Sequence, residues 1–279
     1  MFQNRAEALA LALPAAIFAA AVFLVPVFML LSEGFRTADG WTLSAYGAFF
    51  SDPLNQTVFL RTLKLGALVT VVSAVVGYAA AFAIVNLSPA RKGHVVNLVV
   101  LPLMISPVAR TYAWIVILGR TGIVNQALLS SKLINEPLRM IYTQGAVIVA
   151  MTHVLLPFMI MPIFASLRAI PPEYVQAAMN LGSTRFHAFR AIIVPLSLPG
   201  IFAGSVISFV LALGFYVTPA LVGGAGSLMM ATLIGQQTTV LLDWPFAAAL
   251  STSLLVVTLA VVIIFRRTLS LNKGLNSGI

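Results

Sequence analysis

Six stretches of the chain are continuously apolar, and almost free of charge, over lengths that suit a lipid bilayer. They cover about residues 8–32, 65–87, 95–118, 143–166, 191–214 and 246–265. A helix needs roughly 20 apolar residues to cross the hydrocarbon core of a membrane, whereas a barrel strand needs about 9–11 residues of alternating polarity. The sequence therefore predicts an all-α integral membrane protein with six transmembrane helices, forming a single transmembrane domain over residues 1–279.

The composition agrees with a membrane location and argues against several other classes of protein. The chain is 60% hydrophobic and 8% charged, which is far from the composition of soluble domains. Its net charge of +9 comes from basic residues that flank apolar runs rather than from a basic stripe with aromatic residues, so the predicted partner is the lipid bilayer and not nucleic acid. Without cysteine, and with three widely separated histidines, the chain is expected to hold no metal or cofactor.

The N-terminal apolar run could be either a signal peptide or a first span. Its apolar core is about 24 residues long. The hydrophobic region of a signal peptide has only about 7–15 residues. We therefore interpret the run as a retained transmembrane helix.

Five of the prolines inside predicted spans bear on the course of their helices. Proline removes a backbone N–H and clashes with the preceding turn, so these positions are expected to kink or interrupt their helices. They are Pro102, Pro107, Pro157, Pro162 and Pro199.

Basic residues indicate the orientation of the chain, because they concentrate on the cytoplasmic side of membrane proteins. One side carries Arg5, Arg91, Lys92, Arg168, Arg185, Arg190, Arg266, Arg267 and Lys273, although Arg36, Arg61, Lys64, Arg120, Lys132 and Arg139 fall on the other. The loop 215–245 has no lysine or arginine. We therefore predict that both termini are cytoplasmic and that 215–245 is an extracytoplasmic loop containing a short helix. A further external helix is expected around Tyr46, ending at Asp52-Pro53.

The segment 168–195 is a polar interlude between two spans on the predicted cytoplasmic side. Pro171-Pro172 suits a helix start, and Glu173 places a negative charge in the first turn. Gly182 can adopt the left-handed conformation that ends a helix, and Ser183 can cap a second helix. Two apolar stripes follow this pattern, Tyr174, Ala177, Ala178 and Leu181 in the first helix and Phe186, Phe189 and Ile193 in the second. The alternatives are a docking surface for a cytoplasmic partner and a simple connection.

This segment resembles the cytoplasmic loop of permease subunits of ATP-binding-cassette (ABC) importers. That loop has the pattern E-A-A-x-x-x-G, then nine residues, then I-x-L-P. The matching positions are Gln176, Ala177, Ala178, Gly182, Ile192, Val194 and Pro195, with Gln in place of Glu and Val in place of Leu. Further stretches, among them SPVARTYAWIVILGRTGIVN and DWPFAAALSTSLL, resemble the spermidine/putrescine-type permeases, in their first-permease subfamily.

The resemblance implies a type I importer permease fold in a bacterial inner membrane. It also implies a second, homologous permease subunit, two ATPase subunits that bind ATP and Mg²⁺, and an extracytoplasmic solute-binding protein. This chain is then not an enzyme, and it has no phosphate-binding G-x-x-x-x-G-K-[ST] motif. The residues implied in coupling to the ATPase are Glu173, Gln176, Ala177, Ala178, Gly182, Arg185, Phe186 and Pro195.

Arg110 is the most unusual residue within a predicted span. An arginine in a membrane span usually faces protein or a water-filled cavity, or else extends to the headgroups. It is therefore a candidate for the outer gate or for a contact between subunits, with snorkelling as the alternative. The other candidates for the pathway or gate are Tyr112, Trp114, Tyr216, Asp243 and Trp244, whereas His153 is expected to be a packed, hydrogen-bonded helix residue.

The predicted function is the permease subunit of an ATP-driven importer, with polyamines such as spermidine and putrescine as cargo. Other small solutes remain open, namely opines, aminoethylphosphonate, thiamine or ferric ion. An alternative from another class is a secondary carrier or channel, although no acidic residue lies at the centre of a predicted span. An intramembrane enzyme is disfavoured because the chain has no paired intramembrane carboxylates and no histidine cluster.

Overall fold

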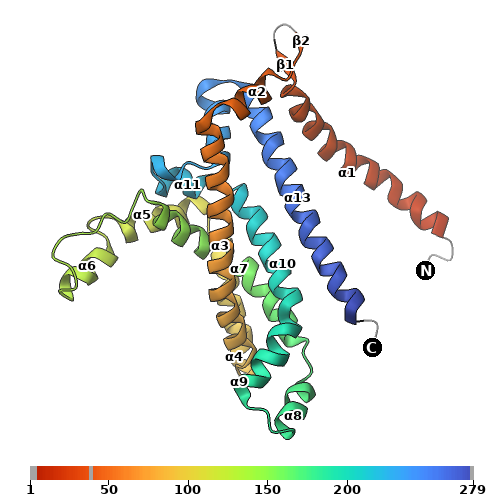
Figure 1. Ribbon diagram of the computed structural model, residues 1–279, viewed down its shortest axis with the longest axis vertical. Coiled ribbons are helices and arrows are strands. Elements are labelled where there is room, and N and C mark those ends of the chain that lie inside the picture. Colours follow the sequence, from red (N-terminus) through yellow and green to blue (C-terminus); the bar gives the residue numbers. More distant parts are fainter. Residues whose placement is uncertain (1–4, 38–39, 277–279) are drawn as a thin grey trace. The chain divides into compact units, whose positions relative to one another are not determined.

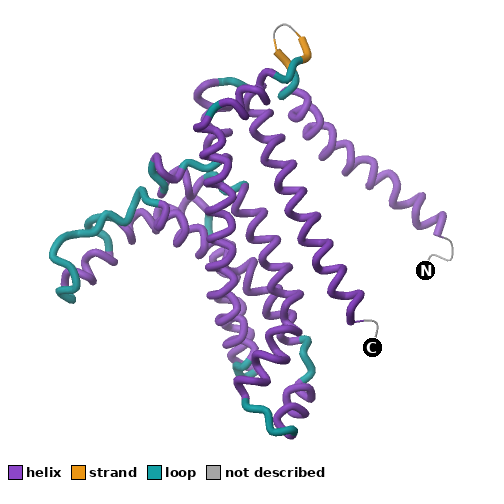
Figure 2. The backbone as a smooth tube through the Cα atoms, viewed as in Figure 1, coloured by secondary structure: helices purple, strands orange, loops and turns teal. Residues whose placement is uncertain are grey.

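The computed structural model describes residues 5–37 and 40–276, and this part of the chain is almost entirely helical (Figure 1) (Figure 2). Within it, the helices long and apolar enough to cross a membrane are Ala12–Glu33, Pro53–Val85, Pro107–Ser130, Gln144–Arg168, Arg185–Leu213 and Trp244–Phe265. The predicted all-α architecture with six spans is confirmed, while several helix boundaries differ from those predicted.

Contacts within the chain group its residues into two compact units. The first comprises Met1–Gln56 and Ile234–Val256, and the second comprises Thr57–Leu233 and Val257–Ile279. Three helices contribute residues to both units: α3 (Pro53–Val85), α12 (Met230–Gln236) and α13 (Trp244–Asn276).

The first unit begins with a membrane-length helix and continues into a short hairpin and a surface helix. Its remaining elements are α1 (Arg5–Glu33), β1 (Arg36–Thr37), β2 (Gly40–Trp41), α2 (Ser44–Ser51) and the π-type turn η4 (Gln237–Leu241). The two strands are antiparallel. The helix expected around Tyr46 is α2, and it ends where predicted, because Asp52 leaves the helical conformation and its Oδ1 accepts a hydrogen bond from the N–H of Leu54 at 2.8 Å.

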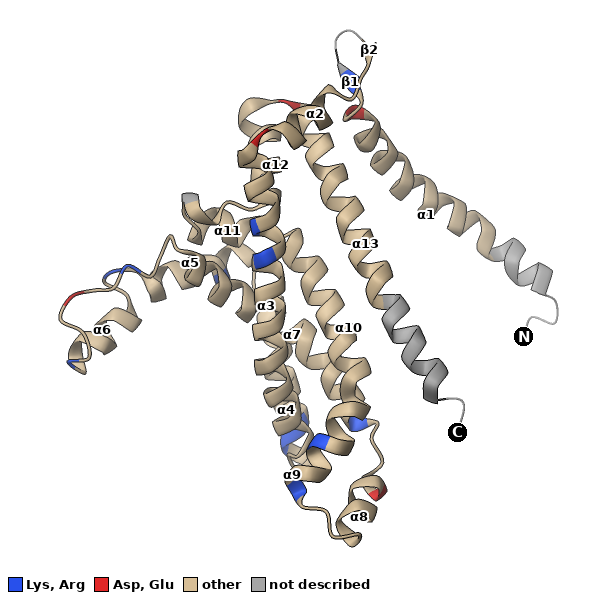
Figure 3. Cartoon of the chain, viewed as in Figure 1, with Lys and Arg blue, Asp and Glu red and all other residues tan. Residues whose placement is uncertain are grey.

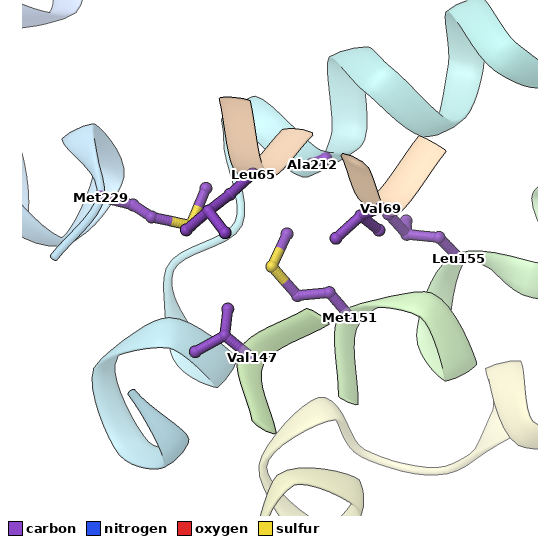
Figure 4. Close-up of a cluster of buried hydrophobic side chains, with 7 residues drawn as sticks. All are labelled: Leu65, Val69, Val147, Met151, Leu155, Ala212 and Met229. Carbon is purple, nitrogen blue, oxygen red and sulfur yellow. The ribbon is translucent and has the colours of Figure 1, made fainter. Parts of the chain in front are cut away.

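The second unit carries most of the remaining elements. They are α4 (Pro89–Val100), η1 (Leu101–Met104), α5 (Pro107–Leu118), α6 (Ile123–Ser130), α7 (Gln144–Arg168), α8 (Pro172–Asn180), α9 (Arg185–Ala188), η2 (Phe189–Ile193), α10 (Val194–Leu213), α11 (Val217–Val222) and η3 (Ala225–Ser227). α7 is the most buried of its membrane-length helices. One core cluster joins α7 to α3, α10 and the segment before α12 (Figure 4), through Leu65, Val69, Val147, Met151, Leu155, Ala212 and Met229.

Two glycines bring α10 unusually close to α7. A Cβ atom on Gly200 would lie 2.5 Å from the carbonyl oxygen of Pro162, and one on Gly204 would lie 3.1 Å from that of Met159. Small residues four positions apart allow helix backbones in a membrane to approach closely. This small-xxx-small pattern lies within the predicted span 191–214.

The predicted continuous span over 95–118 is wrong. α4 ends at Val100, the tight turn of η1 follows, and α5 starts only at Pro107. Ser106 is extended because the residue before a proline avoids the helical conformation. The expected interruption by proline is thus confirmed here, whereas Pro157, Pro162 and Pro199 lie inside uninterrupted helices.

Two helices are longer than the apolar runs that predicted them. α3 begins at Pro53 rather than near 65, and α13 continues to Asn276 rather than ending near 265. Hydropathy marks the lipid-compatible part of a helix, but the backbone hydrogen bonds that form the helix continue through polar residues. The predicted loop 215–245 contains more helix than the single short one expected, namely α11, η3, α12 and η4.

Candidate functional site

The first helix of the polar interlude is α8, and it begins as the sequence predicted. Pro171 is its extended N-cap residue, and Pro172 occupies the first turn, where a missing N–H costs no hydrogen bond. Glu173 follows in the same turn and is exposed, so its carboxylate lies at the positive end of the helix.

The C-terminus of α8 is fixed by a Schellman motif. The N–H of Ser183 donates to the carbonyl of Ala178 at 3.0 Å, and the N–H of Gly182 donates to that of Met179 at 3.0 Å. Gly182 has φ +86°, which confirms its predicted left-handed conformation. The direction in which the chain leaves α8 is therefore set by hydrogen bonds rather than by a slack loop.

The cap of the next helix is Thr184, and the predicted cap at Ser183 is wrong. Thr184 Oγ1 accepts a hydrogen bond from the N–H of His187 at 3.2 Å, which is the geometry of an N-cap. Ser183 belongs to the end of α8, because its backbone N–H completes the Schellman motif, and its Oγ donates to the carbonyl of Thr184 at 3.4 Å. The adjacent hydroxyl residue, Thr184, caps α9.

α9 continues through the π-type turn η2 into the membrane-length helix α10. Phe189 anchors this turn to α3, because its ring packs edge-on against Phe82 at 5.1 Å and against Tyr78 at 6.1 Å between ring centroids. Pro195, in the first turn of α10, follows directly. Proline has no backbone N–H to donate, and a π-type turn before it accommodates the missing hydrogen bond.

Several large apolar side chains of this segment are exposed on the surface of the described part of the chain. Leu181 is 90% exposed and Phe186 is 73% exposed, and Tyr174 and Met179 are also exposed. The predicted second stripe is therefore divided, because Phe189 packs against α3 while Phe186 faces outward. Exposed apolar side chains beside charged ones, here Arg185, are typical of protein-protein contact sites.

Four of the motif positions line two open grooves. The first has a volume of about 610 Å³ and is lined by Ala178, Leu181, Gly182, Ser183, Thr184, His187, Ala188, Ala191 and Ile192. Three positions of the family pattern, Ala178, Gly182 and Ile192, thus share one groove although they are up to 14 positions apart in the sequence. Gln176 instead lines the second groove, of about 360 Å³, with Asn86 and the ends of α3 and α7. Sequence reasoning missed Asn86, since nothing in its local pattern connects it with α8.

Charged residues lie in and beside the α8–α9 segment. Figure 3 shows basic residues in α4 and α9 and an acidic residue in α8. Lys92 of α4 donates from Nζ to the carbonyl of Val85 at 2.9 Å and so stabilises the C-terminus of α3. A positive charge is favourable there because the helix dipole is negative at its C-terminus.

Arg110, in α5, is enclosed by the chain. Only 8% of the residue is exposed, and its Nε and Nη1 have no hydrogen-bond partner among the described residues. Snorkelling is disfavoured, because it requires the guanidinium group to extend toward the surface. Trp114 lies one turn further along α5, on the same face as Arg110.

The other pathway candidates are dispersed. Tyr112 lies on the exposed side of α5, away from Arg110 and Trp114, and Tyr216 is exposed before α11. Asp243 and Trp244 belong to the first unit, where Asp243 Oδ1 accepts a hydrogen bond from the N–H of Phe246 at 3.0 Å and so caps α13. Among residues 5–37 and 40–276, no group of three or more His, Asp or Glu side chains could hold a metal ion.

Comparison with protein families gives one match over most of the chain. Residues 98–269 match the model described as "Binding-protein-dependent transport system inner membrane component". The matched region includes α8, α9 and both grooves' motif positions.

Two named relatives match nearly the full length of the chain. The spermidine/putrescine transport system permease protein PotB of Haemophilus influenzae is 31% identical over 260 residues, which cover 91% of this chain and 90% of that protein. The protein of the same name in Escherichia coli K12 is 32% identical over 260 residues, which cover 90% of this chain and 94% of that protein.

Solved structures share the fold at low sequence identity. A bacterial ABC transporter involved in the import of the acidic polysaccharide alginate has a TM-score of 0.76 at 19% identity, and the match covers 95% of each chain. An amino acid ABC transporter solved with histidines has a TM-score of 0.52 at 19% identity, over 81% of this chain and 95% of that one.

Proposed function

Because the chain belongs to the family of binding-protein-dependent transport system inner membrane components, we propose that it is the pore-forming permease of an ATP-driven importer for spermidine, putrescine or both. The proposed cargo is inferred from the names of the PotB relatives and from similarity over nearly the whole chain. The six membrane-length helices and the fold shared with ABC importer permeases agree with a multi-pass inner-membrane permease.

The proposed coupling surface runs from α8 through the turn at Gly182 and α9 to the start of α10. Its coupling residues are Glu173, Gln176, Ala177, Ala178, Gly182, Arg185, Phe186 and Pro195. The observation that carries the proposal is the pair of exposed side chains, Leu181 and Phe186, held on either side of a hydrogen-bonded turn. Such side chains are costly to leave in water and suit a groove on a cytoplasmic protein.

In this proposal the cytoplasmic partner is a pair of ATPase subunits. They bind ATP and Mg²⁺, and this chain contributes no catalytic residue. Movement of the ATPases would be passed through α9 and η2 to α10, because Phe189 and Pro195 connect the surface to α3 and to the membrane-length helix without a flexible linker. Gln176 gives the surface one fewer negative charge than the family pattern.

The remaining partners are a second, homologous permease subunit and an extracytoplasmic solute-binding protein that delivers the cargo. Both termini are then cytoplasmic, and the loop 215–245 faces the binding protein. Arg110, Tyr112, Trp114, Tyr216, Asp243 and Trp244 are proposed to belong to the gate or pathway, with Arg110 and Trp114 acting as a pair on one face of α5.

Reconstitution tests the cargo and the energy source together. The chain, its second permease, the ATPases and the solute-binding protein would be incorporated into liposomes, and uptake of labelled spermidine would be measured with and without internal ATP. We expect uptake that requires both ATP and the binding protein. Competition with unlabelled putrescine, thiamine, an opine, aminoethylphosphonate and ferric ion would identify a different cargo.

A second set of liposomes containing only this chain distinguishes the transport classes. A secondary carrier or channel would move solute without the ATPases. Solute uptake by the chain alone would therefore contradict the importer proposal, whichever solute is transported.

A further inference from the structure

A pocket with two basic side chains lies on α3, far along the chain from the coupling surface. It is a pocket of about 490 Å³, lined by Thr57, Leu60, Arg61, Lys64, Leu65, Leu68 and Gln144. Six of these residues fall on one face of α3 at helical spacing, and Gln144 is the first residue of α7. The lining thus contains two cations and no acid.

Hydrogen bonds give this pocket defined walls. Arg61 Nη1 donates to the carbonyl of Leu228 at 3.5 Å, and Gln144 Nε2 donates to the carbonyl of Gly226 at 2.7 Å. Both bonds reach the segment before α12, so α3, α7 and this segment meet at the pocket. Lys64 is exposed and makes no ion pair within the described residues.

The length of α3 places the pocket at the level of lipid headgroups. The Lys92 ammonium bonded to the carbonyl of Val85 marks one end of the span, because a charged amine does not remain in hydrocarbon. A hydrocarbon core of about 30 Å corresponds to about 20 helical residues at about 1.5 Å each. Counted back from Val85, the opposite boundary falls near Leu65, directly beside Arg61 and Lys64.

Apolar and basic side chains are ordered along the pocket as a phospholipid requires. Lys64 lies at the predicted headgroup level, and Leu68 lies one turn deeper on the same face, exposed on the surface of the chain. Basic pockets between transmembrane helices on the cytoplasmic side bind the headgroups of anionic lipids, and the same pairing of charges is available to a pocket at the opposite headgroup level. The exposed leucine would contribute nothing to the binding of a soluble anion, whereas it can contact an acyl chain.

We propose that this pocket binds an anionic phospholipid, with Arg61 and Lys64 contacting the headgroup phosphate and an acyl chain lying along Leu60 and Leu68. A bound phosphate would also offset the positive charges of Arg61 and Lys64, which lie on the side of the membrane where basic residues are otherwise disfavoured. It does not depend on which solute the permease carries.

Lipid binding to the purified, delipidated chain tests the proposal. Native mass spectrometry would measure the affinity for phosphatidylglycerol and for phosphatidylcholine with the same acyl chains. We expect tighter binding of phosphatidylglycerol, and we expect Lys64→Gln to weaken it about fivefold, the change that corresponds to about 1 kcal/mol. Lys64→Arg should retain the binding, and Lys132→Gln, in an exposed loop, should have no effect.

Three results would overturn the proposal. The first is equal affinity for the two lipids, and the second is a phosphatidylglycerol preference that Lys64→Gln does not change. The third is full competition by inorganic phosphate at the concentration of the lipid, which would identify a site for the free ion. Because Arg61 also bonds Leu228, Arg61→Gln would be interpreted only together with its thermal unfolding curve.

Discussion

Trp114 in α5 donates a hydrogen bond from its indole Nε1 to Nδ1 of His153 in α7, 3.3 Å away, and the two rings meet edge-on with centroids 5.6 Å apart. Because an indole N–H can only donate, Nδ1 of His153 is the acceptor of this bond. The predicted packed, hydrogen-bonded histidine is therefore confirmed. The pair also ties the helix of Arg110 to the most buried helix of the second unit.

Trp114→Phe is expected to remove this bond while retaining most of the ring contact. The loss of one partly buried hydrogen bond should cost about 1 kcal/mol of unfolding free energy. Thermal unfolding of the purified chain in lipid nanodiscs would measure it. Trp41→Phe, at an exposed position in β2, is the matched control and should leave the midpoint unchanged. Equal midpoints for the two variants would contradict the assigned bond.

Gly200→Ala should weaken the packing of α10 on α7. The added methyl group would meet the carbonyl oxygen of Pro162 at 2.5 Å and the Cα of Ile163 at 3.0 Å, and neither backbone atom can move aside alone. Overpacking of this kind typically costs about 1–3 kcal/mol. Gly214→Ala at the end of the same helix is the control, because its nearest neighbour would be a carbonyl oxygen at 4.0 Å. The unfolding midpoints of the two variants should differ, and a destabilised control would show that glycine loss itself is responsible.

Sequence patterns predicted the elements whose causes are local. The run of apolar residues from 143 to 166 corresponds to α7 within a few positions, and Gly182 adopts the positive φ that its lack of a Cβ allows. The cap of α9 could not be decided in this way, because Ser183 and Thr184 are both good caps. Which of the two side-chain oxygens accepts a hydrogen bond from the first turn of α9 is visible only in three dimensions.

The candidate site was predictable only in part for the same reason. The spacing of Ala178, Gly182 and Ile192 matched a family pattern, but their presence in one groove depends on the turn between α8 and α9. The enclosure of Arg110 depends on helices that are distant in sequence. The apolar run over 95–118 predicted one span because hydropathy alone does not register a helix break, whereas Pro102 and Pro107, which lack N–H donors, did indicate the interruption.

Substitution of Gly182 tests coupling by straining the backbone without a clash with neighbouring residues. A Cβ atom there would meet nothing within 4 Å, so the cost of Gly182→Val arises from φ +86° alone and should be about 1–3 kcal/mol. We expect the turn to shift and ATP hydrolysis in the reconstituted complex to lose its stimulation by cargo-loaded binding protein, while the chain still inserts. Gly182→Asn should retain more coupling, because asparagine tolerates the left-handed conformation.

The control for Gly182→Val is Gly93→Val in α4. An added side chain at Gly93 also meets open space, but the position has no positive φ. Stimulation of ATPase activity should therefore be normal in this variant. Full stimulation in Gly182→Val as well would show that the turn does not transmit coupling.

Leu181→Ala and Phe186→Ala should each weaken binding of the ATPase subunits without destabilising the permease. Both side chains are largely exposed, so their truncation removes little packing within the chain. Apolar anchors at interface centres typically contribute more than about 1 kcal/mol, which corresponds to an affinity loss of about fivefold or more. Titration of the ATPase onto permease in nanodiscs would measure this loss. Leu133→Ala, equally exposed in the loop before α7, should bind the ATPase normally, and an identical loss there would contradict the proposed surface.

The proposed orientation can be tested directly because the chain contains no cysteine. Single cysteines at Asn180, which is exposed at the end of α8, and at Leu133 should lie on opposite sides of the membrane. A maleimide that cannot cross membranes should label Leu133→Cys in right-side-out vesicles and Asn180→Cys only in inverted vesicles, because the basic residues of 168–190 favour the cytoplasmic face. Ala19→Cys, within the first apolar helix, should remain unlabelled in both. The reverse pattern would place the α8 surface outside, where no ATPase could reach it, and would contradict both the orientation and the coupling role.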